Sequence, residues 1–151
     1  MSQALRLATA MARRFEGVRL KPYLCPAVVP TIGIGSTFYL DGRPVKLTDP
    51  AISEETAEHL LQAKLRRIYA PAAIRQVPTA DTFARTAALI DFCLNLGPTR
   101  LKASTLRRKA LAGDWEGAAA EALRWNRAGG RILPGLVLRC QARAAMLKAD
   151  A

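Results

Sequence analysis

The chain has 151 residues, half of them hydrophobic, and its 23 Lys and Arg residues against 12 Asp and Glu residues give a formal net charge of +11. This length fits one domain, and the charge predicts a polyanionic partner without choosing among nucleic acid, anionic lipid and bacterial wall polymers. No apolar run approaches the length of a membrane span. The three cysteines form no CxxC pair, which argues against a zinc ribbon, a thioredoxin-like redox site and a disulfide scaffold.

The first helix is expected over residues 2–14, where apolar residues recur at helical spacing. Its buried face would comprise Leu5, Ala8, Ala12 and Phe15. Charged residues come too early in this segment for a secretory signal, so we expect neither a signal peptide nor a membrane anchor.

The stretch 15–37 joins a carboxylate, an extended segment, a proline-rich turn and a glycine-containing strand. Glu16 ends the apolar helical run, so it should lie at the mouth of a small sheet, beside apolar surface. A carboxyl group in such surroundings tends to keep its proton, which suits a general acid near neutral pH. Gly33 and Gly35 should share one face of the strand, where glycines often mark the close approach of a ligand.

Three short strands are expected in this region, over residues 18–23, 31–36 and 38–40. The prolines within residues 25–30 predict a restrained loop between the first two strands, because each proline fixes its own φ and makes its predecessor extended.

A long helix should follow over residues 53–75, because Ser53 is a good cap and acidic residues fill the first turns. Pro71 should kink or interrupt this helix. Its buried stripe would comprise Leu61, Leu65 and Ile68, with Ala72 as a further candidate.

The remaining chain predicts helices over residues 82–96, 101–111, 115–125 and 134–148, with a flexible loop at 129–131. The helix over 82–96 would bury Phe83, Ala87, Ile90 and Leu94. Cys93 and Cys140 fall on apolar faces and are expected in the core, whereas His59, the single histidine, is expected at the surface. No metal or other cofactor is expected.

Several motifs, taken in order, resemble one known family, the phage-type lysozymes or endolysins of glycoside hydrolase family 24. The run Glu16-Gly17-x-x-Leu20-x-x-Tyr23 followed by Thr31-Ile32-Gly33-Ile34-Gly35 is similar to the active-site hairpin of that family. The similarity continues in Asn95-Leu96-Gly97, Ser104-Thr105-Leu106-Arg107, Arg124-Trp125-Asn126 and Gly129-Gly130-Arg131-Ile132-Leu133-Pro134-Gly135-Leu136. The matches span nearly the whole chain and occur in the family's order.

The resemblance implies an α+β, mostly helical, lysozyme-like fold in a single domain over residues 1–151. A lobe with a small antiparallel sheet would occupy residues 15–52. The connecting helix over about 53–75 would join it to a helical lobe over 79–151, which the N-terminal helix over 1–14 would complete.

The resemblance also implies a set of site residues, with one departure from the family pattern. Glu16 and Thr31 match two members of the family's Glu, Asp and Thr catalytic set, but Cys25 stands at the position of the Asp. The substrate-contacting positions correspond to Gly35, Thr37, Leu94 and Thr105, and Asn95 is a further polar candidate. Trp125 could stack on a sugar, although the core is the more ordinary place for it.

The implied activity is that of a muramidase, which cleaves the β-1,4 bond between N-acetylmuramic acid and N-acetylglucosamine with Glu16 as the general acid. Three versions remain open for Cys25: a base that orients water, a thiolate nucleophile, or no chemical role. Lys21 and Arg19 are close enough in sequence to favour the thiolate. Thr31 could hold the water.

Two other functions remain open. Without the family's Asp, the protein could be a lytic transglycosylase, in which a sugar hydroxyl attacks and an anhydro product forms. It could also be an inactive wall-binding homologue.

Peptidoglycan is the expected partner, and we expect a monomer. A basic C-terminal helix over 136–148, with Arg139, Arg143 and Lys148, could contact anionic outer-membrane lipid. No nucleic-acid recognition motif accompanies the positive charge. The enzyme would stay in the host cytoplasm until a holin-type pore releases it to the cell wall in the periplasm.

Overall fold

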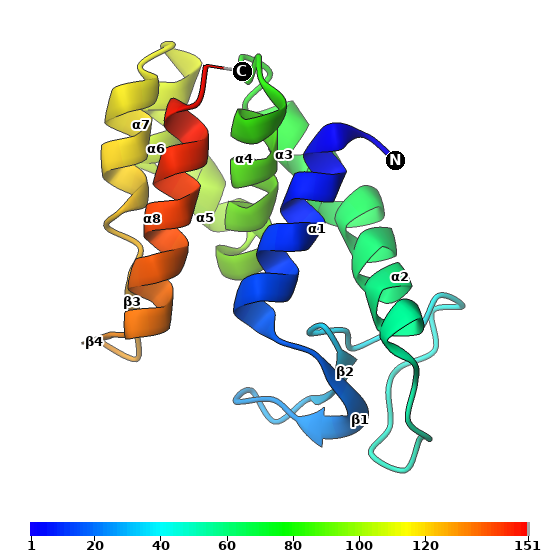
Figure 1. The fold of residues 1–151 in the computed structure, drawn as a ribbon. Helices are drawn as coiled ribbons and strands as arrows, with labels where there is room; N and C mark the ends of the chain where they lie inside the picture. Colours follow the sequence, from blue (N-terminus) through cyan, green and yellow to red (C-terminus); the bar gives the residue numbers. More distant parts are fainter. Residues whose placement is uncertain (151) are drawn as a thin grey trace.

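The computed structural model describes residues 1–150 and shows a mostly helical protein with two small antiparallel sheets (Figure 1). In chain order the elements are α1 (Gln3–Glu16), β1 (Arg19–Leu24), β2 (Pro30–Gly33), α2 (Glu54–Lys64), the π-helical turn η1 (Leu65–Tyr69), α3 (Ala70–Gln76), α4 (Phe83–Leu96), α5 (Pro98–Ala103), α6 (Thr105–Leu111), α7 (Trp115–Ala122), β3 (Arg127–Ala128), β4 (Arg131–Ile132) and α8 (Pro134–Lys148). The predicted α+β class, mostly helical, is confirmed.

Helix α1 begins and ends at residues that typically cap helices. The Ser2 side chain accepts a hydrogen bond from the Leu5 amide at the N-terminus, and Gly17 ends the helix with a φ of 72°. The buried residues Ala8 and Ala12 face α4. The helix therefore runs two residues beyond the predicted end and carries Glu16 in its last position.

The sheet formed by β1 and β2 is shorter than predicted. The strands pair antiparallel, with Tyr23 opposite Thr31. The strand predicted over 31–36 already ends at Gly33, because Gly33 and Gly35 each have a φ of 68° and reverse the chain in a tight turn. The two glycines are thus corners of a turn and do not share a strand face. The third strand, over 38–40, is reduced to an isolated bridge between Phe38 and Pro44.

The connecting segment is helical from Glu54 to Gln76, with Ser53 as its cap, but it changes type along its length. Pro71 does not break it. The preceding turn, η1, is π-helical, with the Ala70 amide bonded to the Leu65 carbonyl, and Pro71 lies in the first turn of α3, where no amide donor is needed. Ile68, predicted in the buried stripe, is 53% exposed.

The C-terminal half differs from the prediction mainly at element ends. Ser104 accepts a hydrogen bond from the Arg107 amide and starts a new helix, so the segment predicted as one helix over 101–111 is two, α5 and α6. Helix α7 ends at Ala122, and Gly129 and Gly130 form the turn of the β3–β4 hairpin, with Arg131 at the start of β4. Phe83, predicted to be buried, is 55% exposed at the start of α4.

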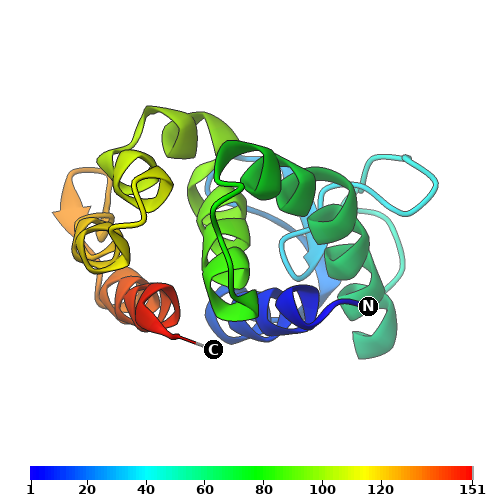
Figure 2. The ribbon, with the colours of Figure 1, turned by 90° about the horizontal axis from the view of Figure 1, so that it is seen from above.

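Helix α4 is central in the arrangement of helices. It lies between α1 and α8 in both views and packs against both, and against α3 (Figures 1 and 2). Buried side chains from α1, α2, α4 and α8 form one apolar cluster, which includes Ala12, Leu61, Phe92 and Leu147. Cys93 and Cys140 are buried and His59 is exposed, as predicted. Within residues 1–150, no helix combines the length and apolar character needed to cross a membrane.

Candidate active site

The candidate acid, Glu16, lies where four elements meet. Its side chain is 31% exposed, and Oε1 accepts a hydrogen bond of 2.7 Å from Nη1 of Arg139 on α8. Its Oε2 faces the turn after β2, since a methyl group built on Gly35 would lie 3.9 Å from that oxygen and 3.9 Å from Nζ of Lys64. Lys64, on α2, donates a hydrogen bond of 2.8 Å to the Gly35 carbonyl. The sequence predicted apolar surroundings for this carboxyl group, but its direct partner is a cation.

A buried ionic network holds Arg139 in place. Asp91, on α4, is fully buried and accepts hydrogen bonds from Nη2 of Arg139 at 2.7 Å and from Nε of Arg143 at 3.0 Å. Arg143 also donates to Oδ1 of Asn95 at 3.1 Å. An unpaired charge at such depth would be strongly destabilising, so each member depends on the others. The network leaves Nη1 of Arg139 to bind Glu16.

The pKa directions around Glu16 follow from burial and these ion pairs. Burial lowers the pKa of Lys64, and the negative charge of Glu16 opposes that shift. Burial also raises the pKa of Tyr69, with smaller contributions from Cys93 and Glu16. Burial disfavours the charged form of Arg139, but its bonds to Asp91 and Glu16 outweigh this effect and raise its pKa.

Sequence reasoning missed Asp91 and assigned Arg139 and Arg143 to an exposed basic helix face. Arg139 is only 3% exposed and Arg143 is fully buried, which leaves Lys148 as the exposed member of the predicted basic set. Two of the three basic residues named for the predicted lipid contact are therefore not available to a membrane surface, and the contact itself stays a prediction. A usable signal was present: a single aspartate within the apolar helix 83–96, and two arginines four positions apart that could meet it.

The candidate second group, Cys25, is held by a small loop that follows β1. The Cys25 amide donates to the Val29 carbonyl at 3.1 Å, and the Val28 amide donates to the Cys25 carbonyl at 2.8 Å. Thr31 is buried, and its hydroxyl donates to the same Val29 carbonyl at 2.9 Å.

The loop makes the Cys25 thiol more acidic than a free cysteine. The pKa of Cys25 is lowered, chiefly by a hydrogen bond from the Val29 backbone, with smaller help from the Ala27 backbone and the Thr31 hydroxyl. The sequence predicted that Arg19 and Lys21 would do this. Arg19 instead stacks on the Tyr23 ring, 4.4 Å from its centroid.

The predicted substrate residues fall into separate places. Gly35 borders Glu16, and Asn95 is joined to it through the buried network. Thr37 lines a pocket of about 240 Å³ beside α2 and η1. Thr105 lines another pocket, of about 420 Å³, together with Trp125, whose ring packs edge-on against Phe92 at 5.2 Å.

Leu94 lines neither of these pockets and packs, partly buried, against the apolar cluster. Within residues 1–150, no group of three or more His, Cys, Asp or Glu side chains is arranged to hold a metal ion.

Comparison with known proteins gives consistent results. Residues 13–143 match the phage lysozyme family. The chain is 34% identical over 142 residues to an endolysin of Acyrthosiphon pisum secondary endosymbiont phage 1, covering 91% of this chain and 92% of that protein. It is 31% identical over 118 residues to the endolysin of Salmonella phage P22, covering 78% of this chain and 79% of that protein.

Solved structures agree with these relatives. An endolysin from Escherichia coli O157:H7 phage FAHEc1 superposes with a TM-score of 0.84 at 29% identity, covering 97% of this chain and 93% of that one. A P22 lysozyme variant superposes with a TM-score of 0.83 at 27% identity, covering 94% and 95%.

Proposed function

This chain belongs to the phage lysozyme family, and we propose that it hydrolyses the β-1,4 bond between N-acetylmuramic acid and N-acetylglucosamine in peptidoglycan. It is a peptidoglycan-hydrolysing glycoside hydrolase by family. One observation supports the position of the chemistry: Glu16 ends α1 with a partly exposed carboxyl group that faces Gly35, a residue without a side chain to cover it.

Glu16 would act as the general acid, and its two oxygens have different tasks. Oε1 is bonded to Arg139, whereas no hydrogen bond from another residue in 1–150 reaches Oε2. A proton on Oε2 can therefore pass to the glycosidic oxygen as its bond to the sugar breaks. Arg139 then stabilises the carboxylate that remains, until solvent returns a proton.

Cys25 would take the part of the second carboxylate. Its lowered pKa increases the thiolate fraction near neutral pH, which allows it to accept a proton from the attacking water. The Thr31 hydroxyl donates to the Val29 carbonyl, which supports a role in fixing the loop. Its oxygen can still accept a hydrogen bond from the attacking water.

Mass spectrometry of digested peptidoglycan tests the reaction. Hydrolysis yields reducing ends, each one water heavier than the anhydro ends of a transglycosylase. We expect hydrolysed ends from the wild type and from Cys25→Asp, and far fewer products from Glu16→Gln in the same digestion time. Anhydro ends from the wild type would contradict the proposal.

The same digestion distinguishes the possible roles of Cys25. A covalent glycosyl adduct on the intact protein would identify Cys25 as a nucleophile. Equal rates for Cys25→Ala and the wild type would show that the thiol has no chemical role.

Two alternatives depend on the missing carboxylate at position 25. A lytic transglycosylase needs one acidic residue, which Glu16 supplies, so anhydro ends would favour it. An inactive wall-binding protein would bind purified peptidoglycan without releasing fragments, and Glu16→Gln would then change nothing.

We also propose that the protein acts as a monomer in one lysozyme-like domain. The apolar cluster supports the single domain, because it includes residues of both α1 and α8. The family membership supports action on the cell wall in the periplasm, after release from the host cytoplasm by a separate holin-type pore.

A further inference from the structure

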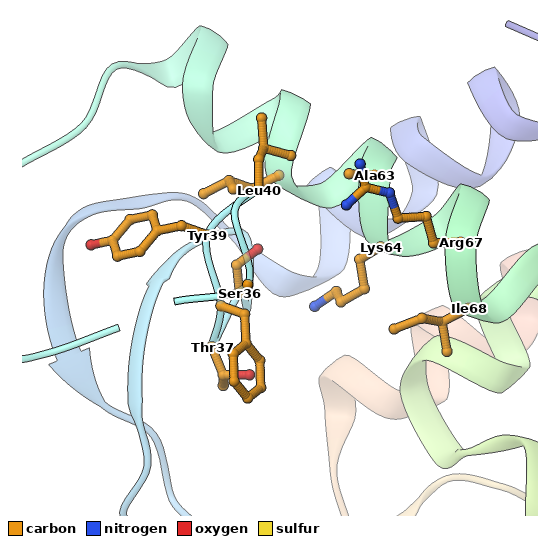
Figure 3. A pocket seen from close by; sticks show the side chains of 11 residues that line it. Ser36, Thr37, Tyr39, Leu40, Ala63, Lys64, Arg67 and Ile68 are labelled. Carbon is orange, nitrogen blue, oxygen red and sulfur yellow. The ribbon is translucent and has the colours of Figure 1, made fainter. Parts of the chain in front are cut away.

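A pocket lies next to the candidate active site, beside the segment that follows Gly35. Residues 36–40 and Gly42 form one wall of a pocket of about 240 Å³, and α2 with η1 forms the other wall. Figure 3 shows Lys64 and Ile68 across this space from the segment that carries Ser36 and Thr37. We call it the hairpin pocket.

The walls of the hairpin pocket are largely apolar and open to solvent. Phe38 is 59% exposed, Leu40 is 50% exposed and Ile68 is 53% exposed, and all three line it. Large apolar side chains that remain exposed around one concave site favour ligand binding.

The charged groups of the hairpin pocket are all cations. Lys64 and Arg67 line it, and no carboxylate does. Lys64 already binds the Gly35 carbonyl, but Arg67 makes no hydrogen bond or ion pair with any other residue in 1–150. Arg67 lies in η1. Short π-helical turns are rare in proteins overall, and those that occur are often found at functional sites.

The pocket is contiguous with the candidate acid. Lys64 belongs to its wall, and Nζ of Lys64 and Oε2 of Glu16 each lie 3.9 Å from a methyl group built on Gly35. A glycan strand bound with its scissile bond at Glu16 would therefore pass the mouth of this pocket.

We propose that the hairpin pocket binds the peptide stem that peptidoglycan carries on its muramic acid, with Arg67 pairing with a stem carboxylate. The inference rests on the proposed function. A stem is a short anionic peptide with methyl side chains, so its chemistry complements apolar walls and an unpaired guanidinium group. An anionic lipid would also match cation and apolar surface, but contiguity with Glu16 favours a group attached to the glycan itself.

The test compares two substrates: purified peptidoglycan, and the same glycan after an amidase has removed its stems. We expect the wild type to prefer the stem-bearing glycan in kcat/KM. Arg67→Glu should reduce that preference by up to about fivefold, as expected for the loss of one exposed ion pair.

Arg66→Glu is the matched control, because this substitution changes the charge by the same amount. Arg66 is exposed and does not line the pocket. We expect it to keep the wild-type preference, and we expect both variants to act alike on the stripped glycan. Ala63→Phe, which fills the pocket without changing charge, should reduce the preference as Arg67→Glu does. Thermal unfolding of each variant verifies that it is folded.

Equal wild-type activity on both substrates would overturn the stem proposal and leave the proposed function intact. An equal loss of preference in Arg67→Glu and Arg66→Glu would also overturn the stem proposal, because it would indicate long-range charge attraction. Loss of binding to phosphatidylglycerol vesicles by Arg67→Glu, with an unchanged preference for stems, would assign the pocket to lipid instead. Failure of the wild type to cleave either substrate would overturn both proposals.

Discussion

The two candidate catalytic side chains are positioned in opposite ways. Glu16 is held by side chains from distant elements, through Arg139 on α8 and Asp91 on α4. Cys25 is held by residues close to it in the sequence, since backbone hydrogen bonds with Val28 and Val29 close its loop. The acid therefore depends on the packing of the helical part of the molecule, and the thiol depends on the turn after β1.

This difference predicts that substitutions in the two regions will affect stability and activity differently. A change in the buried network should lower stability and activity together, because the network is both core and support for Glu16. A change in the Cys25 loop should alter activity and its pH dependence while the fold survives.

Removal of the acid itself should have the largest effect on rate. Glu16→Gln keeps the side chain's size and removes its titratable proton, so kcat should fall by about 10²- to 10⁴-fold. Thermal unfolding should stay close to that of the wild type, because the side chain is 31% exposed. Hydrolysis that persists in this variant would rule out Glu16 as the proton donor.

Breaking the buried network should have the largest effect on stability. Asp91→Asn leaves Arg139 and Arg143 without their common counter-charge, and we expect a loss of about 3–5 kcal/mol in the free energy of unfolding by denaturant. Glu54→Gln is the control, because it breaks an ion pair with Arg13 in which the Glu54 side chain is 65% exposed. That change should cost less than about 1 kcal/mol. Similar losses in both variants would contradict the buried role of Asp91.

Changes at Cys25 should move the pH dependence of hydrolysis. The thiol must lose its proton to act as a base, so wild-type activity should fall as the pH drops below the lowered pKa of Cys25. Cys25→Asp should stay active at more acidic pH than the wild type, because an aspartate side chain has an ordinary pKa of about 3.9. Cys25→Ala should be slower by about 10²-fold. Identical pH–rate profiles for all three proteins would show that residue 25 is not the base.

The Cys25 loop can be tested with a smaller change at Thr31. Thr31→Val removes the hydroxyl that bonds to the Val29 carbonyl, which should cost about 1 kcal/mol of stability and raise the pKa of Cys25. Thiol alkylation against pH measures that pKa. Cys93 should not interfere, because burial raises its pKa to about 12. An unchanged alkylation profile would show that Thr31 does not support the thiolate.

Much of the fold could be predicted because its signals are local. Ser2, Ser53 and Thr82 cap helices whose starts agree with the sequence pattern within one or two residues. The failures occurred where backbone conformation overrode a pattern. Gly33 and Gly35 appeared to belong to one strand, but their positive φ angles make a turn, and Pro71 was accommodated by a π-helical turn.

The sequence by itself determined the family, the order of the helices and the presence of Glu16, Cys25 and Thr31, because motif order and helical spacing are properties of neighbouring residues. Only the tertiary structure decided what surrounds Glu16 and which cation is free to bind a ligand. Arg139 lies 123 positions from Glu16 and 48 from Asp91 in the chain, and no local pattern relates residues so far apart. Their meeting follows from the packing of α1, α4 and α8, where a buried charge must find its partner.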